Sequence, residues 1–108
     1  MNKLIAICIL SLSPLLAQAS GDAQAGKAKA AQVCAACHGA EGNKPSAPDQ
    51  PVLAGQYPDY LVHALGEYKS GKRTNPIMHG FASQLSEKDM EDLAAWFSSQ
   101  STPLHTQR

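Results

Sequence analysis

The sequence has no excess of charge of either sign, because nine Lys and Arg residues balance nine Asp and Glu residues in 108 positions. A nucleic-acid partner needs a basic face that neutralises phosphates, so this composition argues against one. Large apolar side chains are also scarce: there are one Trp, two Phe, three Tyr and three Met. A core made from so few would be thin, and we therefore expect a body other than side chains to fill the middle.

The sequence also lacks any stretch in which apolar and polar residues alternate as in a half-buried strand, so it predicts an all-α fold. An alanine-rich segment without proline, 22–35, favours a first helix. Pro58 suits a first helical position and Gly71 a helix end, which together bound a second helix. Ser86 begins a sequence that resembles a capping box, and the apolar stripe behind it predicts a third helix that ends near Ser99.

Two segments dense in glycine and proline, 39–56 and 72–84, predict irregular loops between these helices. The sequence shows no internal repeat, and its length suits one domain. We therefore expect a single domain over 20–108, with three main helices and two loops.

The first 19 residues have the three parts of a secretory signal peptide. Lys3 gives a positive start, 4–16 is an apolar stretch, and Ala17-Gln18-Ala19 places small residues where a signal peptidase reads them. A membrane-spanning helix would need about 20 apolar residues. A lipoprotein signal would have a small residue before its cysteine, whereas Ile7 precedes Cys8. We expect cleavage after Ala19 and a periplasmic protein without a membrane anchor.

Only two cysteines remain after this cleavage, Cys34 and Cys37, and His38 follows directly. The spacing C-x-x-C-H is the attachment motif of a c-type haem, because the two thiols can add to the two vinyl groups of one porphyrin beside the imidazole. A thioredoxin-like redox pair would follow a strand, a structural zinc site needs four ligands, and a plain disulfide would leave the histidine without a role. The motif favours one covalent haem c, which would also supply the apolar body that the composition lacks.

Further features extend along the chain: Gly26 stands eight residues before Cys34, and the segments 34–39, 51–56, 71–73 and 75–78 are followed by Leu93, Trp96 and Phe97. With these features the sequence resembles the class I c-type cytochromes, in particular the small single-haem bacterial proteins and one half of the di-haem ones. The resemblance covers nearly all of 20–108. It fails at Ala30, where many members have an aromatic residue, and this predicts a looser crossing of the first and last helices unless Trp96 or Phe97 fills the space.

The resemblance implies a class I cytochrome c fold and gives roles to individual residues. Cys34 and Cys37 would carry the thioether bonds, and His38 would be the proximal ligand of the haem iron. The backbone carbonyl of Pro51 would accept a hydrogen bond from the other ring nitrogen of that histidine. From the residues alone, an ordinary loop proline is an equally good interpretation of Pro51.

Met78 is the expected sixth ligand of the iron. Its competitor Met90 falls on the apolar stripe of the third helix, where a core methionine belongs. Met78 lies instead in the second predicted loop, behind Pro76, and a loop can deliver a thioether to the far face of a porphyrin. His79 is adjacent, but neighbouring residues of an extended loop point in opposite directions. The resemblance implies the same methionine.

Several other residues are candidates for lesser roles. Tyr57 and Arg73 are possible hydrogen-bond partners of the haem propionates. Lys69, Lys72 and Arg73 form a basic cluster that is either a docking patch or the solvated end of a helix. His63 lies off the apolar stripe of the second helix, and we expect it to be solvated. The core candidates that would wrap the haem are Leu53, Leu65, Ile77, Phe81, Leu85 and Trp96.

These expectations favour a soluble electron carrier rather than an enzyme. Two side chains on the iron leave no position for a substrate, so the protein would move single electrons between a membrane-bound donor and a terminal oxidase or reductase. A gas sensor or a small haem enzyme, in which the sixth ligand is displaced, is the alternative. Binding of carbon monoxide to the reduced protein discriminates the two.

Overall fold

The computed structural model describes residues 21–103. The predicted signal peptide and its cleavage site after Ala19 lie outside the described residues. Within the described range the chain forms helices and no strands, which confirms the all-α fold. The five helices are α1 (Ala23–Val33), α2 (Ala35–His38), α3 (Pro58–Ser70), α4 (Pro76–Ala82) and α5 (Glu87–Ser98).

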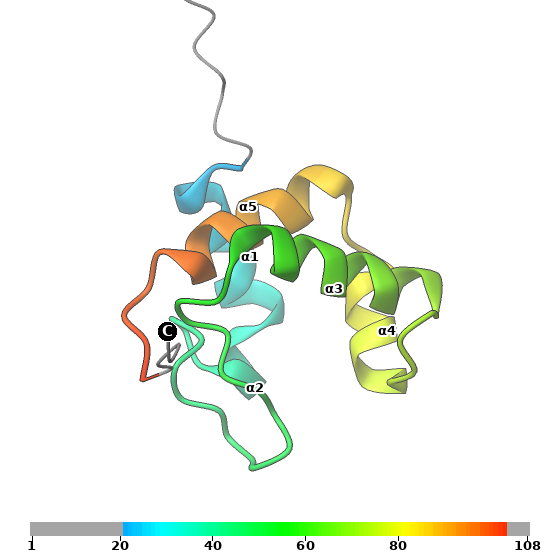
Figure 1. Cartoon of the computed structure of the whole chain (residues 1–108), viewed down its shortest axis with the longest axis horizontal. Helices are drawn as coiled ribbons and strands as arrows, with labels where there is room; N and C mark the ends of the chain where they lie inside the picture. Colours follow the sequence, from blue (N-terminus) through cyan, green and yellow to red (C-terminus); the bar gives the residue numbers. More distant parts are fainter. Residues whose placement is uncertain (1–20, 104–108) are drawn as a thin grey trace, which may run out of the picture.

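The first and last of these helices cross closely, as Figure 1 shows for α1 and α5. A Cβ atom on Gly26 would lie 1.9 Å from the carbonyl oxygen of Asp92 and 2.9 Å from the Cβ atom of Trp96, so only glycine allows this approach. The side chain of Asp92 also accepts a hydrogen bond of 2.7 Å from the backbone N–H of Asp22, the N-cap residue of α1. The crossing is therefore fixed by a close backbone approach and a cap-to-helix hydrogen bond.

The absence of an aromatic residue at Ala30 does not leave a gap at this crossing. Ala30 is fully buried and belongs to the same apolar cluster as Phe97, with Trp96 packed against its edge. The indole N–H of Trp96 donates to the carbonyl oxygen of Ala40 at 3.0 Å, and the Lys27 ammonium lies 5.5 Å from its ring centroid. The aromatic residues of α5 thus supply the bulk that Ala30 lacks.

The predicted boundaries of the second and third expected helices are confirmed. Helix α3 begins at Pro58 and ends at Ser70, and its C-cap residue Gly71 has a φ of +82°, a left-handed conformation that glycine adopts without strain. Helix α5 begins after Ser86, and a capping box joins Ser86 to Asp89 in both directions. Ser99 is its C-cap residue.

The sequence predicts one continuous helix over 22–35, but the structure has a break within this segment. Helix α1 ends at Val33, and Cys34 has a φ of −117° that opens the helix for one residue before α2 begins. The hydrogen bonds continue across this break, because Cys34 N–H donates to Ala30 and His38 N–H donates to Cys34. The C-x-x-C-H motif therefore lies on a separate helical turn and not on a continuation of α1.

The prediction of a loop throughout 72–84 is wrong, because 76–82 forms helix α4. The side chain of Asn75 accepts hydrogen bonds from the backbone N–H groups of Ile77 and Met78, and Pro76 occupies the first turn. A capping side chain followed by a proline is a helix start. Pro76 and Gly80, which favour a loop in the sequence, are both accommodated in this short helix.

The other predicted loop, 39–56, is irregular as expected. Its backbone is tied to the rest of the chain by three hydrogen bonds. Ser46 N–H donates to Cys37, Leu53 N–H donates to Gly42, and Gly55 N–H donates to Phe97, at 2.9, 2.7 and 2.9 Å. These bonds fold the loop back over α2 and against the end of α5.

The core formed by the described residues is small in side-chain volume. Leu93 is the largest fully buried side chain, and five of the ten buried apolar residues are alanines. None of the helices in residues 21–103 is both long and apolar enough to cross a membrane. Helices α3 and α4 contact each other, and α3 also contacts α5, which leaves a cavity between them and α2.

Candidate functional site

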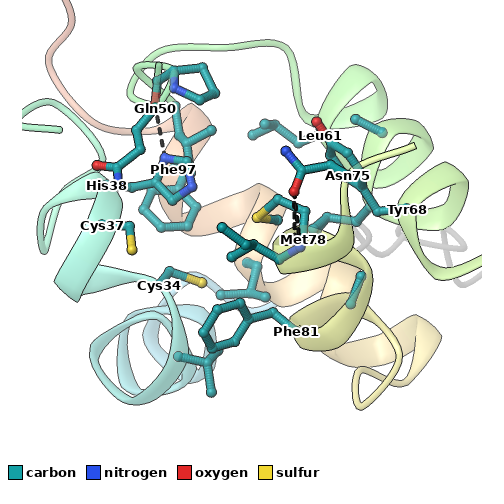
Figure 2. Close-up of a pocket in the computed structure, with 18 of the residues that line it drawn as sticks. Cys34, Cys37, His38, Gln50, Leu61, Tyr68, Asn75, Met78, Phe81 and Phe97 are labelled. Carbon is teal, nitrogen blue, oxygen red and sulfur yellow. Dashed lines mark hydrogen bonds between the residues drawn. The ribbon is translucent and has the colours of Figure 1, made fainter. Parts of the chain in front are cut away.

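A cavity of about 220 Å³ lies at the centre of the described residues. Figure 2 shows His38 on one side of it, Met78 on the other, and the sulfur atoms of Cys34 and Cys37 along one edge. Most of its lining is apolar side chains from α3, α4 and α5. Among the described residues that line it, Asp49 is the only carboxylate. A flat apolar group with reactive positions at one edge would fit this shape and chemistry.

The two cysteines are free thiols rather than a disulfide. Burial raises the pKa of the Cys34 thiol to about 11, and the nearby Cys37 adds to the effect. Two thiols that are not joined to each other remain available to form the two thioether bonds of a covalently attached group.

His38 is held in one orientation by the loop that covers it. The side chain is 7% exposed, and its Nδ1 lies 2.9 Å from the carbonyl oxygen of Pro51. Because a carbonyl can only accept, Nδ1 carries the proton and donates, which leaves the lone pair on Nε2. A metal-binding histidine is commonly fixed in this way by a carbonyl acceptor behind it. The structure thus contains the hydrogen bond to Pro51 that the family resemblance implies.

Met78 lies opposite His38, on the first turn of α4. The Asn75 cap accepts from the Met78 N–H at 3.1 Å and fixes the start of this helix, and both residues line the cavity. His79 points elsewhere, since its Nδ1 lies 2.8 Å from the backbone carbonyl of Tyr68 in α3. Met90 is 6% exposed within the apolar core cluster and does not line the cavity.

The loop wall of the cavity depends on Gln50. Its side-chain oxygen accepts hydrogen bonds from the Ser46 N–H at 3.0 Å, the Ser46 hydroxyl at 2.8 Å and the Ala47 N–H at 3.0 Å. Three donors on one amide oxygen fold 46–50 into a tight turn. This turn leads directly into Pro51, the acceptor for His38.

The structure brings together only some of the predicted site residues. Cys34, Cys37, His38, Pro51 and Met78 all line the cavity. Five of the six core candidates also line the cavity: Leu53, Leu65, Ile77, Phe81 and Leu85. Two of them nevertheless keep large exposed fractions, 68% for Ile77 and 42% for Phe81. Trp96 does not line it, because this face of α5 turns toward α1 and Ala40.

The polar candidates lie outside the cavity lining. Tyr57 is 62% exposed at the start of α3. Arg73 lies over the rings of Tyr60 and Tyr68, 5.8 and 5.3 Å from their centroids, and 3.8 Å from Glu67. Propionate binding by Tyr57 and Arg73 stays a prediction. His63, expected to be solvated, is exposed, and its Nε2 contacts the carboxylate of Glu67.

Sequence reasoning missed four polar residues that line the cavity: Asp49, Gln50, Tyr68 and Asn75. For Asn75 a signal was present, because an asparagine before a proline is typical of a helix start. Tyr68 follows Leu61 and Leu65 at the spacing of an apolar helix stripe, and this pattern predicts a core position but no polar role. The role of Gln50 depends on the turn formed by 46–50, and no local sequence pattern predicts that turn.

The chain matches the cytochrome c family over residues 23–101. It is 52% identical over 101 residues to cytochrome c4 of Pseudomonas aeruginosa, an alignment that covers 93% of this chain and 49% of that protein. The crystal structure of reduced recombinant cytochrome c4 from Pseudomonas stutzeri superimposes with a TM-score of 0.71 at 44% identity, over 78% of this chain and 48% of that one.

A further relative is the thiosulfate dehydrogenase electron acceptor of Stutzerimonas stutzeri strain A1501, 39% identical over 80 residues, which are 74% of this chain and 37% of that protein. The chain thus spans about half the length, or less, of these relatives. The family match extends from α1 to beyond the end of α5 and contains the whole cavity. The chain therefore belongs to the cytochrome c family, and its cofactor is covalently bound haem c.

Proposed function

We propose that this protein carries single electrons between redox proteins, with Cys34 and Cys37 attached to the haem and His38 and Met78 as the two axial ligands. One observation carries the proposal: an imidazole and a thioether face each other across a cavity that has two free thiols at its edge. When bound, haem c supplies an iron centre that gains or loses one electron without a change in covalent bonds. The residues around it determine whether that is all it does.

His38 would hold its side of the site through the loop. The hydrogen bond from Nδ1 to the Pro51 carbonyl fixes the ring and directs Nε2 toward the cavity. Since the same loop is anchored at Ser46 and Gly55, the carbonyl cannot move freely when the charge of the site changes. A rigid acceptor behind the ring keeps the reorganisation on electron transfer small.

Met78 would hold the opposite side. It is the methionine that lines the cavity, whereas Met90 is committed to the core and His79 to the carbonyl of Tyr68. A thioether in a largely apolar lining favours the reduced, less positive state of the metal. The arrangement thus favours a higher reduction potential than a pair of imidazoles would give.

An electron carrier fits this arrangement better than an enzyme or a gas sensor. If His38 and Met78 both bind the iron, no open position would remain on it for substrate or oxygen. The thiosulfate dehydrogenase electron acceptor, by its name, exchanges electrons with a protein. We propose protein partners for this chain also, namely a membrane-bound donor and a terminal oxidase or reductase.

We also propose that the protein works in the periplasm after removal of residues 1–19. The support is the three-part pattern of that segment, in particular Ala17-Gln18-Ala19. Covalent haem attachment to a pair of thiols also suits an exported protein. The intact mass of the purified protein should equal that of residues 20–108 plus one haem, and an unprocessed N-terminus recovered with membranes would refute the proposed cleavage.

The substitution Met78→Ala tests the ligand pair. We expect it to abolish the sulfur-to-iron charge-transfer band of the oxidised protein, to lower the reduction potential and to let carbon monoxide bind the reduced protein at once. The unsubstituted protein should keep its spectrum unchanged under carbon monoxide. Rapid binding there would favour the sensor or enzyme, and a charge-transfer band that survives in Met78→Ala would show that another residue is the ligand.

A further inference from the structure

Helix α4 has little apolar burial to hold it in place. It has seven residues, of which Ala82 is buried, while Ile77 and Phe81 keep large exposed fractions. A helix this short is not stable in water by itself, because too few hydrogen bonds compensate for its nucleation. The position of Met78 therefore depends on the polar contacts that α4 makes.

One of these contacts joins a side chain of α4 to the backbone of α3. The ring nitrogen Nδ1 of His79 lies 2.8 Å from the carbonyl oxygen of Tyr68. This carbonyl belongs to the last turn of α3, where carbonyls lack helical partners, and it also accepts from the Gly71 N–H at 3.3 Å. A donor N–H suits this negative end of the helix.

The other ring nitrogen and the neighbouring backbone support the same orientation. The Ser83 hydroxyl lies 3.5 Å from Nε2 of His79 and 2.6 Å from the His79 carbonyl oxygen. Because the Tyr68 carbonyl can only accept, the proton is on Nδ1. The ring is thereby turned to α3 and cannot at the same time enter the cavity beside Met78.

Two further contacts hold the two ends of this region, and one of them also comes from the end of α3. Lys69, one residue after Tyr68, donates from its ammonium group to the carbonyl oxygen of Leu85, just after α4. At the other end, the Asn75 cap secures the first turn of α4 within its own segment. His79 lies between these two points.

We propose that His79 is a positioning residue for the sixth ligand: its Nδ1–H bond to the Tyr68 carbonyl holds α4 on the end of α3 and so keeps the Met78 thioether in the cavity. This inference rests on the proposed ligation by Met78. It explains why a histidine next to the ligand is compatible with methionine ligation. The imidazole is engaged outside the cavity, where it supports the ligand instead of replacing it.

The test compares His79→Leu with His79→Asn in the haem-loaded protein. The side-chain nitrogen of asparagine occupies the position of histidine Nδ1, so His79→Asn can keep the donor, whereas leucine has the shape of asparagine without it. Leucine is also the better helix former of the two. A weakening seen only with leucine therefore cannot come from lost helix propensity. His63→Leu is the matched control, since His63 is exposed on α3 and pairs with Glu67 away from the cavity.

The measured quantity is the apparent affinity of the oxidised protein for added imidazole, which must displace Met78 from the iron. This affinity rises in proportion to the fraction of molecules in which Met78 has left. Loss of one hydrogen bond of ordinary strength raises that fraction about two- to tenfold. We expect this rise in His79→Leu, with an earlier loss of the sulfur charge-transfer band on heating. Values near those of the unsubstituted protein are expected in His79→Asn and His63→Leu.

An unchanged imidazole affinity in His79→Leu would overturn the inference, and so would an equal rise in His79→Asn and His79→Leu. If His79→Leu is poorly loaded with haem, the heating experiment on His79→Asn and His63→Leu still decides, because a band in His79→Asn that is lost well before that of His63→Leu contradicts a retained donor. Met78→Ala separates the two proposals. If the charge-transfer band persists in Met78→Ala, the ligand assignment fails. If Met78→Ala loses the band while His79→Leu matches the unsubstituted protein, the ligand assignment holds and only the role of His79 is refuted.

Discussion

Removal of both thioether attachments is expected to leave a chain that does not fold cooperatively. The change is the double substitution Cys34→Ala and Cys37→Ala, expressed without haem-attachment machinery so that no haem enters. The reason lies in the core: Leu93 is its largest fully buried side chain, and several residues packed around it, among them Leu61 and Phe97, also border the open cavity.

The expected loss can be worked out from the cavity. An unfilled volume of about 220 Å³, at roughly 24 cal/mol per Å³, costs about 5 kcal/mol. A domain of the described length, residues 21–103, has a total stability of roughly 4–12 kcal/mol. The empty cavity therefore removes a large part of the free energy of unfolding, and all of it only at the bottom of this range.

Far-ultraviolet circular dichroism during thermal unfolding measures this directly. The haem-loaded protein should melt in one cooperative step, whereas the haem-free double variant should show reduced helicity and a gradual loss of signal. The single variant Cys37→Ala, loaded with haem through its remaining thioether, should still melt cooperatively. Native helicity and a sharp transition in the haem-free double variant would refute the claim that haem supplies the core.

Three other substitutions test separate parts of the structure. Met90→Ala should cost about 2–5 kcal/mol of unfolding free energy while the charge-transfer band stays, because Met90 is a buried core residue; loss of the band would make it the ligand. Gly26→Ala should destabilise by about 1–3 kcal/mol, since its Cβ would lie 1.9 Å from the Asp92 carbonyl oxygen. The control Gly66→Ala, with nothing within 4 Å, should stabilise by up to about 1 kcal/mol, and equal effects would contradict this. The hydrogen bond from Lys88, followed by that from the Asp22 N–H, lowers the pKa of Asp92 below its ordinary 3.8, so it stabilises the folded state above that pH. The advantage of the unsubstituted protein over Asp92→Asn in denaturant unfolding should be full at pH 7 and shrink as the pH falls below about 4, and a constant difference would exclude this origin.

The parts of the fold that the sequence predicts are those fixed by local chemistry. Pro58, Gly71 and Ser86 act within one helical turn, through a preset φ, a left-handed glycine and a capping hydroxyl, so their effects can be read without knowledge of the rest. The C-x-x-C-H motif is local in the same sense, because its spacing alone places two thiols and an imidazole where one haem can bind them. These features place the main helices and one edge of the site.

The parts that the sequence does not predict depend on contacts between distant segments. Helix α4 is stabilised by its Asn75 cap and by the end of α3, and its own apolar pattern is too short to reveal it. The orientation of Trp96 depends on a carbonyl 56 residues away. A pattern along the chain can say that such a residue is apolar or can cap, but not which partner it will meet.

The two axial candidates are held by different means, and this difference follows from the scarcity of apolar side chains. His38 lies within a helical turn next to both cysteines and is buried beneath a loop anchored at several backbone positions. Met78 lies on a short helix whose position depends on a cap and a few hydrogen bonds with exposed partners. Since local opening begins where few buried apolar contacts must be broken, the methionine side opens before the histidine side. In a protein whose core is filled by the cofactor, the histidine ligand can therefore be held firmly. On the methionine side, small changes in hydrogen bonding can still adjust access to the iron.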